Sequence, residues 1–307
     1  MSPATGADAL RTAQDAFGVH PGCRALHARG TLLAGTFTAT PEAAALSRAA
    51  HLQGEPVRVT VRFSNGSGDP ATPDFAPDVR GLAVKFYLPG GQRTDIVAQS
   101  APRFPVSTPE AFLELIRAQK RDPASLWRLP LFLARHPGAA LRLPKNLSGL
   151  LPPVSYATCS YHAVHAYGLL NATDDCRYVR YTLVPEAGAH RLRPLSARRK
   201  GRDYLEEEIR ARLQRAPVRF TLSLQLAAAG DPTDDPSRYW AADRERVDAG
   251  KLELTGLDTE RETGDDVLVF DPTRVTDGIE LSGDPVLRYR ADAYAASVEF
   301  RSGRTRS

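Results

Sequence analysis

The chain has 307 residues, 42% of them hydrophobic and 25% charged, and 40 Lys and Arg against 36 Asp and Glu give it a net charge of +4. This composition is typical of a soluble globular protein with a packed core, and the length predicts one large domain or two ordinary ones. The three cysteines include no Cys-x-x-Cys pair, which argues against a disulfide framework and against a zinc site.

The N-terminus lacks a basic start followed by an apolar core, so the sequence predicts no secretory signal. The Leu-rich segment Leu126–Leu151 is interrupted by basic residues and prolines and is too broken to span a bilayer. The densest basic cluster, Arg191–Arg202, is interpreted as a solvated loop. We therefore expect a cytoplasmic protein without a membrane or nucleic-acid partner.

Hydrophobic periodicity predicts an α+β protein in which antiparallel strands predominate. In chain order, the expected elements of the first half are a helix at Ala4–Phe17, a strand at Gly30–Thr38, a helix opened by Thr40 and Pro41 and running through Ala43–His51, strands at Pro56–Ser64, Leu82–Tyr87 and Thr94–Ala98, and a helix at Pro109–Arg121. The second half predicts broken helices over Ala124–Pro153, a strand within Tyr156–Tyr167, a strand at Cys176–Pro185, a helix at Asp203–Arg215, strands at Pro217–Leu226, Lys251–Thr255 and Asp266–Phe270, and a helix at Pro285–Val298.

One histidine near the N-terminus is a candidate acid–base residue. His27 lies between Arg24 and Arg29, directly before the strand at Gly30–Thr38. A single histidine beside a strand is more often a surface or core residue, so the other segments decide its meaning. The expected strand Pro56–Ser64 places Arg62 and Ser64 on its polar face. That face meets water on an outer strand, or an anion if the strand belongs to a barrel.

The C-terminal helix carries an unusual polar stripe. Arg290, Tyr294, Ser297 and Arg301 fall on one face, which makes a poor core stripe unless it meets an anion or a metal, since a buried arginine needs a partner. A free phenol is a poor metal ligand at neutral pH, and a guanidinium one helical turn earlier favours the phenolate. The alternative is a solvated amphipathic helix with a chance Arg–Tyr pair.

Several motifs occur in one order along the chain. They are RxxHAxG at 24–30, VRFS at 61–64, DxRGxAVKFY at 78–87, DIV at 95–97, FDP at 270–272 and RxxxY at 290–294. Together they resemble the haem catalase family, and the short length fits its branch of catalase-related peroxidases. The resemblance implies an antiparallel β-barrel with surrounding helices, a C-terminal haem-ligand helix, and haem b as cofactor.

The resemblance also implies roles for single residues. His27 is the expected distal acid–base residue, with Ser64 as its partner and Asp78 near the substrate channel. Haem propionates would meet Arg24, Arg62 and Arg301, and aromatic rings near the distal haem face would come from Phe104 and Phe112. Tyr294 would be the ligand of the haem iron, supported by Arg290.

The chain departs from the family pattern on the distal side. Gln99 stands where the family has an asparagine, and its extra methylene would displace the amide donor by about 1.5 Å. A displacement of that size predicts weak or absent disproportionation of hydrogen peroxide. Gln99 or the adjacent Ser100 is expected to orient the peroxide.

His162 and His165 are three residues apart, a spacing that metal ligands on a helix can have. We favour the interpretation that they pack in the core or at the haem edge, because the segment matches a strand of the family.

The expected function is a haem peroxidase that uses hydrogen peroxide or organic hydroperoxides to oxidise a small organic donor. The alternatives are rearrangement of a lipid hydroperoxide, as in allene oxide synthases of this superfamily, and haem binding without catalysis. Residues 1–22 are expected to form an N-terminal helical arm and residues 23–307 a single haem-binding domain. The sequence leaves a homodimer open.

Overall fold

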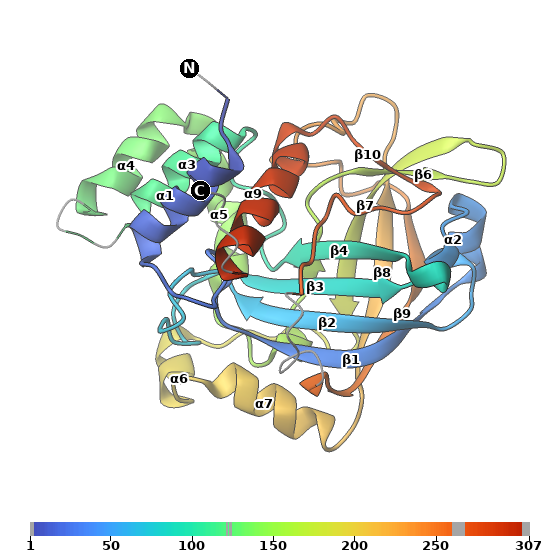
Figure 1. The fold of residues 1–307 in the computed structure, drawn as a ribbon, viewed down its shortest axis with the longest axis horizontal. Coiled ribbons are helices and arrows are strands. Elements are labelled where there is room, and N and C mark those ends of the chain that lie inside the picture. The colour runs from blue at the N-terminus through green and yellow to red at the C-terminus, as the bar shows by residue number, and fades with distance from the viewer. Residues whose placement is uncertain (1–2, 121, 123–124, 260–267, 303–307) are drawn as a thin grey trace.

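The computed structural model describes residues 3–120, 122, 125–259 and 268–302. Its centre is an antiparallel β-barrel (Figure 1). The strands are β1 (Gly30–Ala39), β2 (Val57–Asn65), β3 (Arg80–Tyr87), β4 (Arg93–Gln99), β5 (Tyr161–His162), β6 (Tyr167–Leu170), β7 (Cys176–Pro185), β8 (Val218–Leu226), β9 (Arg246–Leu257) and β10 (Ile279–Leu281).

The barrel closes because β8 pairs on one side with β9 and on the other with β7. The closed circuit runs β7-β5-β4-β3-β2-β1-β9-β8, and β6 and β10 extend it from β7. Closure removes the exposed strand edges that an open sheet would leave unpaired. The predicted α+β class with an antiparallel barrel is confirmed.

The helices lie outside the barrel (Figure 1). They are α1 (Gly6–Phe17), α2 (Pro41–Leu46), α3 (Pro109–Ala118), α4 (Ser125–Arg135), α5 (Pro137–Leu150), α6 (Pro194–Arg199), α7 (Tyr204–Leu213) and α9 (Pro285–Arg301), with short 3-10 turns at Ala50–Leu52, Pro89–Gly91 and Tyr156–Thr158. Helix α1 packs against α9 so closely that Gly6 has no space for a side chain beside the carbonyl of Asp292. The predicted N-terminal helix is therefore in contact with the rest of the fold.

Aromatic rings fill the barrel interior. Phe63 on β2 stacks on Tyr156 with ring centroids 5.1 Å apart. The ring centroids of Tyr161 and Phe220 lie 5.8 and 6.1 Å from that of Phe63. All four side chains are at most 2% exposed. Burial on this scale, roughly 25 cal/mol per Å² of apolar surface, is the main source of barrel stability.

The outer face of β2, β3 and β4 carries polar residues that are nevertheless buried. Pairing aligns Ser64, Gly81 and Gln99 in one row across the three strands. A second row aligns Arg62 with Ala83. Arg62 and Ser64 are only 9% and 4% exposed, because helices cover this face of the barrel. This face is therefore covered by helices and is not an outer surface of the molecule.

Two buried networks hold the loops at the end of these strands. The guanidinium of Arg80, fully buried, donates to the backbone carbonyls of Asp74, Ala76 and Asp78. The carboxylate of Asp95 pairs with Lys85 at 2.5 Å and accepts from the backbone N–H of Asp271 at 2.9 Å. The first network shapes the Gly- and Pro-rich loop after β2, and the second fixes the FDP segment against β4.

Three predicted bounds were wrong for physical reasons. The helix expected to run through His51 ends at Leu46, because the Ser47 hydroxyl and the Arg48 N–H bond to the carbonyls of Gly278 and Leu170. Strand β9 is longer than predicted, since β1 and β8 pair with it along most of its length. The basic loop contains the short helix α6, although its basic residues are exposed as expected, apart from the partly buried Arg191.

Of the strand predicted at Asp266–Phe270, residues 266 and 267 lie outside the described residues. Residues 268–270 form no strand.

A pH dependence of stability follows from His51, whose ring is 2% exposed and whose Nδ1 has no hydrogen-bond partner among the described residues. Burial lowers its pKa to about 4. The unfolded chain therefore binds a proton that the folded chain rejects between about pH 6.5 and 4, so this residue makes the protein less stable as the pH falls through that window. Between pH 7 and pH 5, the free energy of unfolding of His51→Phe should fall by about 2 kcal/mol less than that of the parent.

The measurement is urea unfolding at both pH values. The exposed His190→Phe is the matched control and should leave the pH dependence as it is in the parent. An unchanged pH dependence in His51→Phe would contradict the argument.

Candidate functional site

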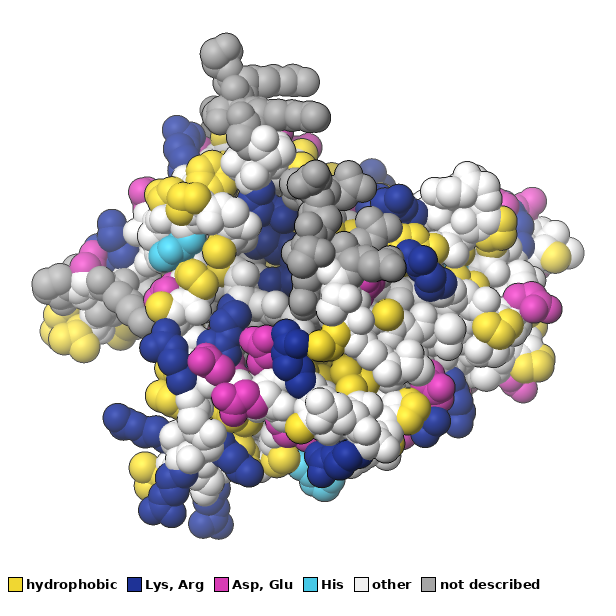
Figure 2. Space-filling view, turned by 60° about the horizontal axis from the view of Figure 1, so that its bottom comes forward, with side chains coloured by type: hydrophobic (Ala, Val, Ile, Leu, Met, Phe, Trp, Pro, Cys, Tyr) yellow, Lys and Arg dark blue, Asp and Glu magenta, His cyan; other side chains and the backbone are white. Residues whose placement is uncertain are grey.

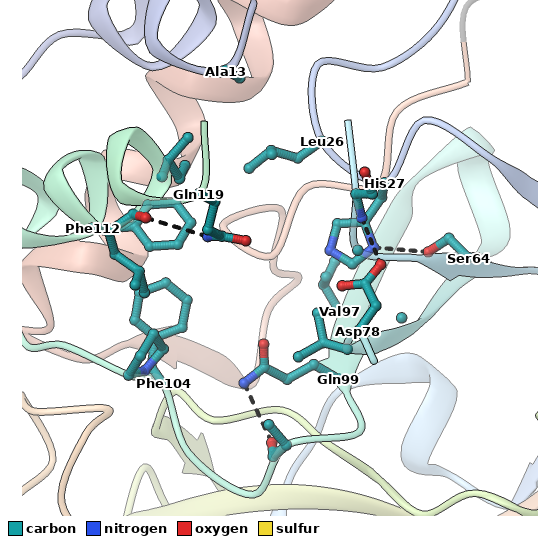
Figure 3. Close-up of a pocket in the computed structure, with 18 of the residues that line it drawn as sticks. Ala13, Leu26, His27, Ser64, Asp78, Val97, Gln99, Phe104, Phe112 and Gln119 are labelled. Atoms are coloured by element: carbon teal, nitrogen blue, oxygen red, sulfur yellow. Dashed lines mark hydrogen bonds between the residues drawn. The ribbon is translucent and has the colours of Figure 1, made fainter. Parts of the chain in front are cut away.

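A cavity of about 700 Å³ lies between the outer face of β2–β4 and helices α1, α3 and α9. Most of its lining is apolar, and a few polar side chains enter it from separate elements. Figure 3 shows His27, Ser64 and Asp78 on one side of this pocket and Phe104, Phe112 and Gln119 on the other. A large apolar pocket with few polar groups is the usual form of a cofactor or small-molecule site.

His27 is held in an unusual backbone conformation at the edge of the cavity. Its φ is 54°, in the left-handed region that few residues other than glycine adopt. The conformation is fixed by hydrogen bonds: the His27 N–H donates to the carbonyl of Gly66 at 3.0 Å, and the Arg62 guanidinium donates to the carbonyl of His27 at 2.9 Å. Such strain is common where a side chain must be aimed at a site.

The ring of His27 is oriented by Ser64. Nδ1 of His27 lies 3.0 Å from the Ser64 hydroxyl oxygen. Gly81, paired with Ser64 on the next strand, leaves the space: a Cβ at this position would come within 2.6 Å of the Ser64 oxygen and 2.9 Å of Nδ1. The glycine of the DxRG motif is therefore required for the contact between His27 and Ser64.

The surroundings of His27 disfavour its charged form. Burial, followed by the positive charges of Arg62, Arg290 and Arg24, lowers the pKa of His27 to about 3. The imidazole is therefore neutral throughout the physiological pH range and able to accept a proton.

Gln99 lies at the edge of the same cavity, but its amide is turned away from the predicted role. Its Nε2 donates to the carbonyls of Ala101 and Arg103 at 3.3 and 3.0 Å. Figure 3 shows the side-chain oxygen directed toward the pocket. The cavity therefore meets a hydrogen-bond acceptor where the sequence predicted a displaced donor.

Ser100 does not line the cavity. Its hydroxyl donates to the carbonyl of Gly149 at 2.6 Å and accepts from the N–H of Arg80. These bonds connect β3 to helix α5, so the alternative expectation that Ser100 orients a peroxide is not met by its position.

The two predicted aromatic residues both line the cavity. The rings of Phe104 and Phe112 lie 4.9 Å apart between centroids (Figure 3). Phe104 is 7% exposed and belongs to a second apolar cluster with Phe132 and Val286, outside the barrel. The position is therefore compatible both with core packing and with contact to a planar ligand.

Asp78 lies at the end of the Gly-rich loop and lines the cavity on the His27 side (Figure 3). One carboxylate oxygen accepts from the N–H of Ser67 at 2.9 Å. Burial raises the pKa of Asp78 above its usual value, partly offset by the charge of Arg80.

A chain of hydrogen bonds crosses from the barrel to helix α9. Arg290 donates to the Tyr294 oxygen at 2.8 Å and to Nε2 of His165 at 3.0 Å. Because an arginine can only donate, Nε2 accepts, and Nδ1 of His165 must donate to the Asp284 carboxylate, 2.6 Å away. Asp284 also caps α9 by accepting from the N–H groups of Val286 and Leu287.

The sequence did not reveal this chain of bonds. It identified Asp284 as the helix cap and paired Arg290 with Tyr294, but it interpreted His165 as a packing residue. His165 is fully buried, and burial lowers its pKa despite the hydrogen bond that it donates to Asp284. In the sequence, the only signal for its role was a histidine within a mainly apolar segment. It lies between β5 and β6 and has no partner until the fold brings α9 beside it.

Four arginines surround the cavity. Arg24, Arg62, Arg290 and Arg301 all line it, and no carboxylate of the described residues forms an ion pair with any of them. Burial, together with mutual repulsion, lowers the pKa of Arg24 and brings that of Arg62 to about 10. Burial also lowers the pKa of Arg301.

Arg290 differs from the other three. Burial alone would lower its pKa, but the charge of the Tyr294 oxygen and the hydrogen bond to it raise it. The Arg–Tyr–Ser–Arg face predicted for the C-terminal helix does point into the cavity, since Ser297 and Arg301 line it together with Arg290 and Tyr294.

The residues present fit a haem. The cavity offers apolar walls for a macrocycle, uncompensated guanidinium groups for two carboxylates, and one phenol oxygen paired with a cation as an iron ligand. Among the described residues, no cluster of three His, Cys, Asp or Glu side chains could hold a metal ion.

Comparison with known proteins identifies the family of the chain. The family model for catalase matches residues 22–306. The chain is 48% identical to a catalase-related peroxidase of Mycolicibacterium paratuberculosis, over 99% of this chain and 96% of the relative. It is 34% identical to a catalase-related peroxidase of Synechococcus elongatus, over 95% of this chain and 87% of the relative.

Solved catalases share the fold. A fungal catalase superposes with a TM-score of 0.82 at 24% identity, over 92% of this chain and 60% of that chain. Catalase A from Saccharomyces cerevisiae gives 0.81 at 24% identity, over 91% and 61%. This chain thus spans about three fifths of the length of these two catalases and nearly the whole length of the two peroxidases. The chain belongs to the catalase family, whose members use haem, and it is an oxidoreductase that acts on peroxide.

Proposed function

We propose that this protein is a haem b peroxidase that reduces hydrogen peroxide or an organic hydroperoxide at the expense of a small organic donor, with weak or no disproportionation of hydrogen peroxide. The observation that carries the proposal is the arrangement around one cavity of a neutral histidine and an arginine-bound tyrosine. In this proposal Tyr294 is the iron ligand, and Arg24, Arg62 and Arg301 bind the propionates. Phe104 and Phe112 contact the distal side.

When bound, the haem supplies the redox-active iron through which the O–O bond is broken and electrons are drawn from the donor. The protein moves the proton. His27, with its Nδ1 proton donated to Ser64, accepts a proton at Nε2 from one peroxide oxygen and returns it to the departing one, which leaves as water or an alcohol. Because the pKa of His27 is about 3, its protonated form is a strong acid and returns the proton readily.

Gln99 is the residue from which we infer weak disproportionation of hydrogen peroxide. Its carbonyl oxygen can accept a hydrogen bond from a hydroperoxide O–H, whereas its N–H groups are bound to backbone carbonyls. A donor to the bound peroxide is therefore missing from this position, which supports weak disproportionation. The large apolar cavity also keeps the rearrangement of a lipid hydroperoxide as a second candidate function; product analysis without a reductant separates the two.

Replacing Tyr294 by Phe tests the iron ligand. The change removes the phenol oxygen to which Arg290 donates in the cavity, so we expect the haem content per chain to fall several-fold and the Soret band with it. Tyr289→Phe is the matched control, because it removes a hydroxyl from the same helix whose partner is the carbonyl of Thr5. Equal haem content in Tyr294→Phe and the parent would rule out the ligand role.

Replacing His27 by Ala tests the proton transfer. We expect kcat/KM for cumene hydroperoxide to fall by about 10² to 10⁴ while haem content is retained. Since a base with a pKa of about 3 is already deprotonated, the parent should show no inflection assignable to His27 between pH 5 and 8, and its rate should fall only below about pH 4. An inflection near pH 6.5 that disappears in His27→Ala would contradict the depressed pKa.

Gln99→Leu tests the acceptor role. Loss of one hydrogen bond to the hydroperoxide should lower kcat/KM about tenfold without changing haem content. Gln99→Asn, which shortens the side chain by one methylene and frees its amide from the carbonyl of Arg103, should raise oxygen release from hydrogen peroxide. If both variants match the parent in peroxidase and oxygen-release rates, Gln99 has no part in binding the peroxide.

A further inference from the structure

The outward face of helix α4 is apolar. Leu126 and Trp127 are 78% and 76% exposed, and Leu131 is 50% exposed. Pro130 is exposed beside them, and Phe132 is the residue of this helix that is buried. A surface helix normally turns its polar face to water, so this helix presents the face that is usually covered.

Helix α5 continues the same surface. Leu141 is 81% and Leu147 is 50% exposed, and Pro144 between them is exposed as well. Within the described residues, eight of the twelve exposed large hydrophobic side chains lie between Leu126 and Leu151. Scattered exposed leucines are ordinary, but a concentration of this kind marks an interaction surface.

The charges of this hairpin are all of one sign. No aspartate or glutamate occurs between residues 123 and 173. Arg135 and Lys145 are exposed and Arg142 is partly exposed, whereas Arg128 is paired with Asp122. The hairpin therefore combines exposed apolar side chains with cations that no acidic residue of the hairpin neutralises.

Helix α6 adds to this side of the molecule. Leu195 is 76% exposed, and Arg198, Arg199 and Lys200 follow it three to five residues later. Figure 1 places α6 below α4 on the left of the molecule, and Figure 2 shows several Lys and Arg side chains at the lower left.

The charge pattern decides between two occupants. In a two-fold dimer the same patch meets itself, so Arg135, Arg142 and Lys145 would face their own copies without acidic partners. An anionic lipid surface matches both properties, because it takes up Leu and Trp side chains at the headgroup boundary and attracts Lys and Arg. None of the described helices is long and apolar enough to cross a bilayer, so the contact would be peripheral.

The hairpin also forms part of the cavity wall. Leu129 and Leu133 of α4 and Leu143 and Leu150 of α5 line it, while Leu126, Trp127 and Leu141 do not. The outward side chains are thus available for a lipid surface, and the inward ones form an apolar part of the cavity lining behind them.

We propose that the α4–α5 hairpin docks on an anionic lipid surface and admits hydroperoxides dissolved in that surface to the cavity. The docking stands on the exposed residues alone, and the substrate class rests on the proposed peroxidase function. This proposal revises the expectation that the protein has no membrane partner. The sequence argued against a segment that spans the bilayer, and not against a peripheral contact.

The test is co-sedimentation of the haem-loaded protein with vesicles of phosphatidylcholine, with and without phosphatidylglycerol. We expect binding only to the anionic vesicles, weakened by salt. Leu126→Ser combined with Trp127→Ser should weaken binding to the anionic vesicles at least about tenfold. Each substitution removes an apolar side chain whose burial in the lipid changes the affinity by about that factor. Val184→Ser, a 41% exposed residue on β7, is the matched control and should bind like the parent.

Turnover is measured in parallel with a phospholipid hydroperoxide in the vesicles and with cumene hydroperoxide in solution. We expect the double variant to lose activity on the first and keep it on the second. Absence of turnover with cumene hydroperoxide in the parent would contradict the proposed function, while the sedimentation result would still stand.

Three results would overturn the docking proposal. They are no binding to anionic vesicles, equal binding to neutral ones, and unchanged binding of the double variant. Sedimentation velocity is run on the same samples: a dimer that the double variant dissociates, without vesicle binding, would assign the surface to a second copy of the chain.

Discussion

The structure depends on how it accommodates four arginines around one cavity. A buried guanidinium is costly without an anionic partner, and among the described residues Arg24, Arg62, Arg290 and Arg301 have no carboxylate paired with them. Hydrogen bonds to carbonyls satisfy part of Arg24 and Arg62, at Leu268 and His27. The positive charge that remains favours binding of a ligand with negative groups. The fold places these arginines around a cavity on the outside of the closed barrel.

The two sides of the cavity are built differently. His27 is positioned by local backbone strain and by a glycine on the neighbouring strand, so it relies on β2, β3 and the loop that follows β2. Tyr294 is positioned through Arg290 and His165 by the capping carboxylate of its own helix. Asp284 therefore starts the helix and fixes the tautomer of His165 at once, which couples the formation of α9 to the geometry of the site.

Much of the barrel could be predicted because alternation of apolar and polar residues is a local signal. The strand that carries Arg62 and Ser64 was found in this way, and its register then placed Gly81 and Gln99 beside them. Three features could not be read locally. The role of His165 needs Arg290, 125 residues away; the orientation of the Gln99 amide needs the carbonyl of Arg103; and the early end of α2 needs the carbonyl of Gly278. The bonds of His165 and Ser47 are tertiary and outweigh local preferences, whereas the Gln99 bond joins residues four positions apart and depends on how the chain bends after β4.

The central claim is that the arginines bind the carboxylates of a planar cofactor. The direct measurement is the affinity of the haem-free chain for haem and for haem dimethyl ester, in which both carboxylates are blocked, followed by the Soret band. The account predicts one haem per chain and an affinity for the ester at least about a hundredfold weaker, since charge-assisted hydrogen bonds to the propionates are lost. Equal affinity for the two compounds would show that the arginines serve another anion and would contradict the account.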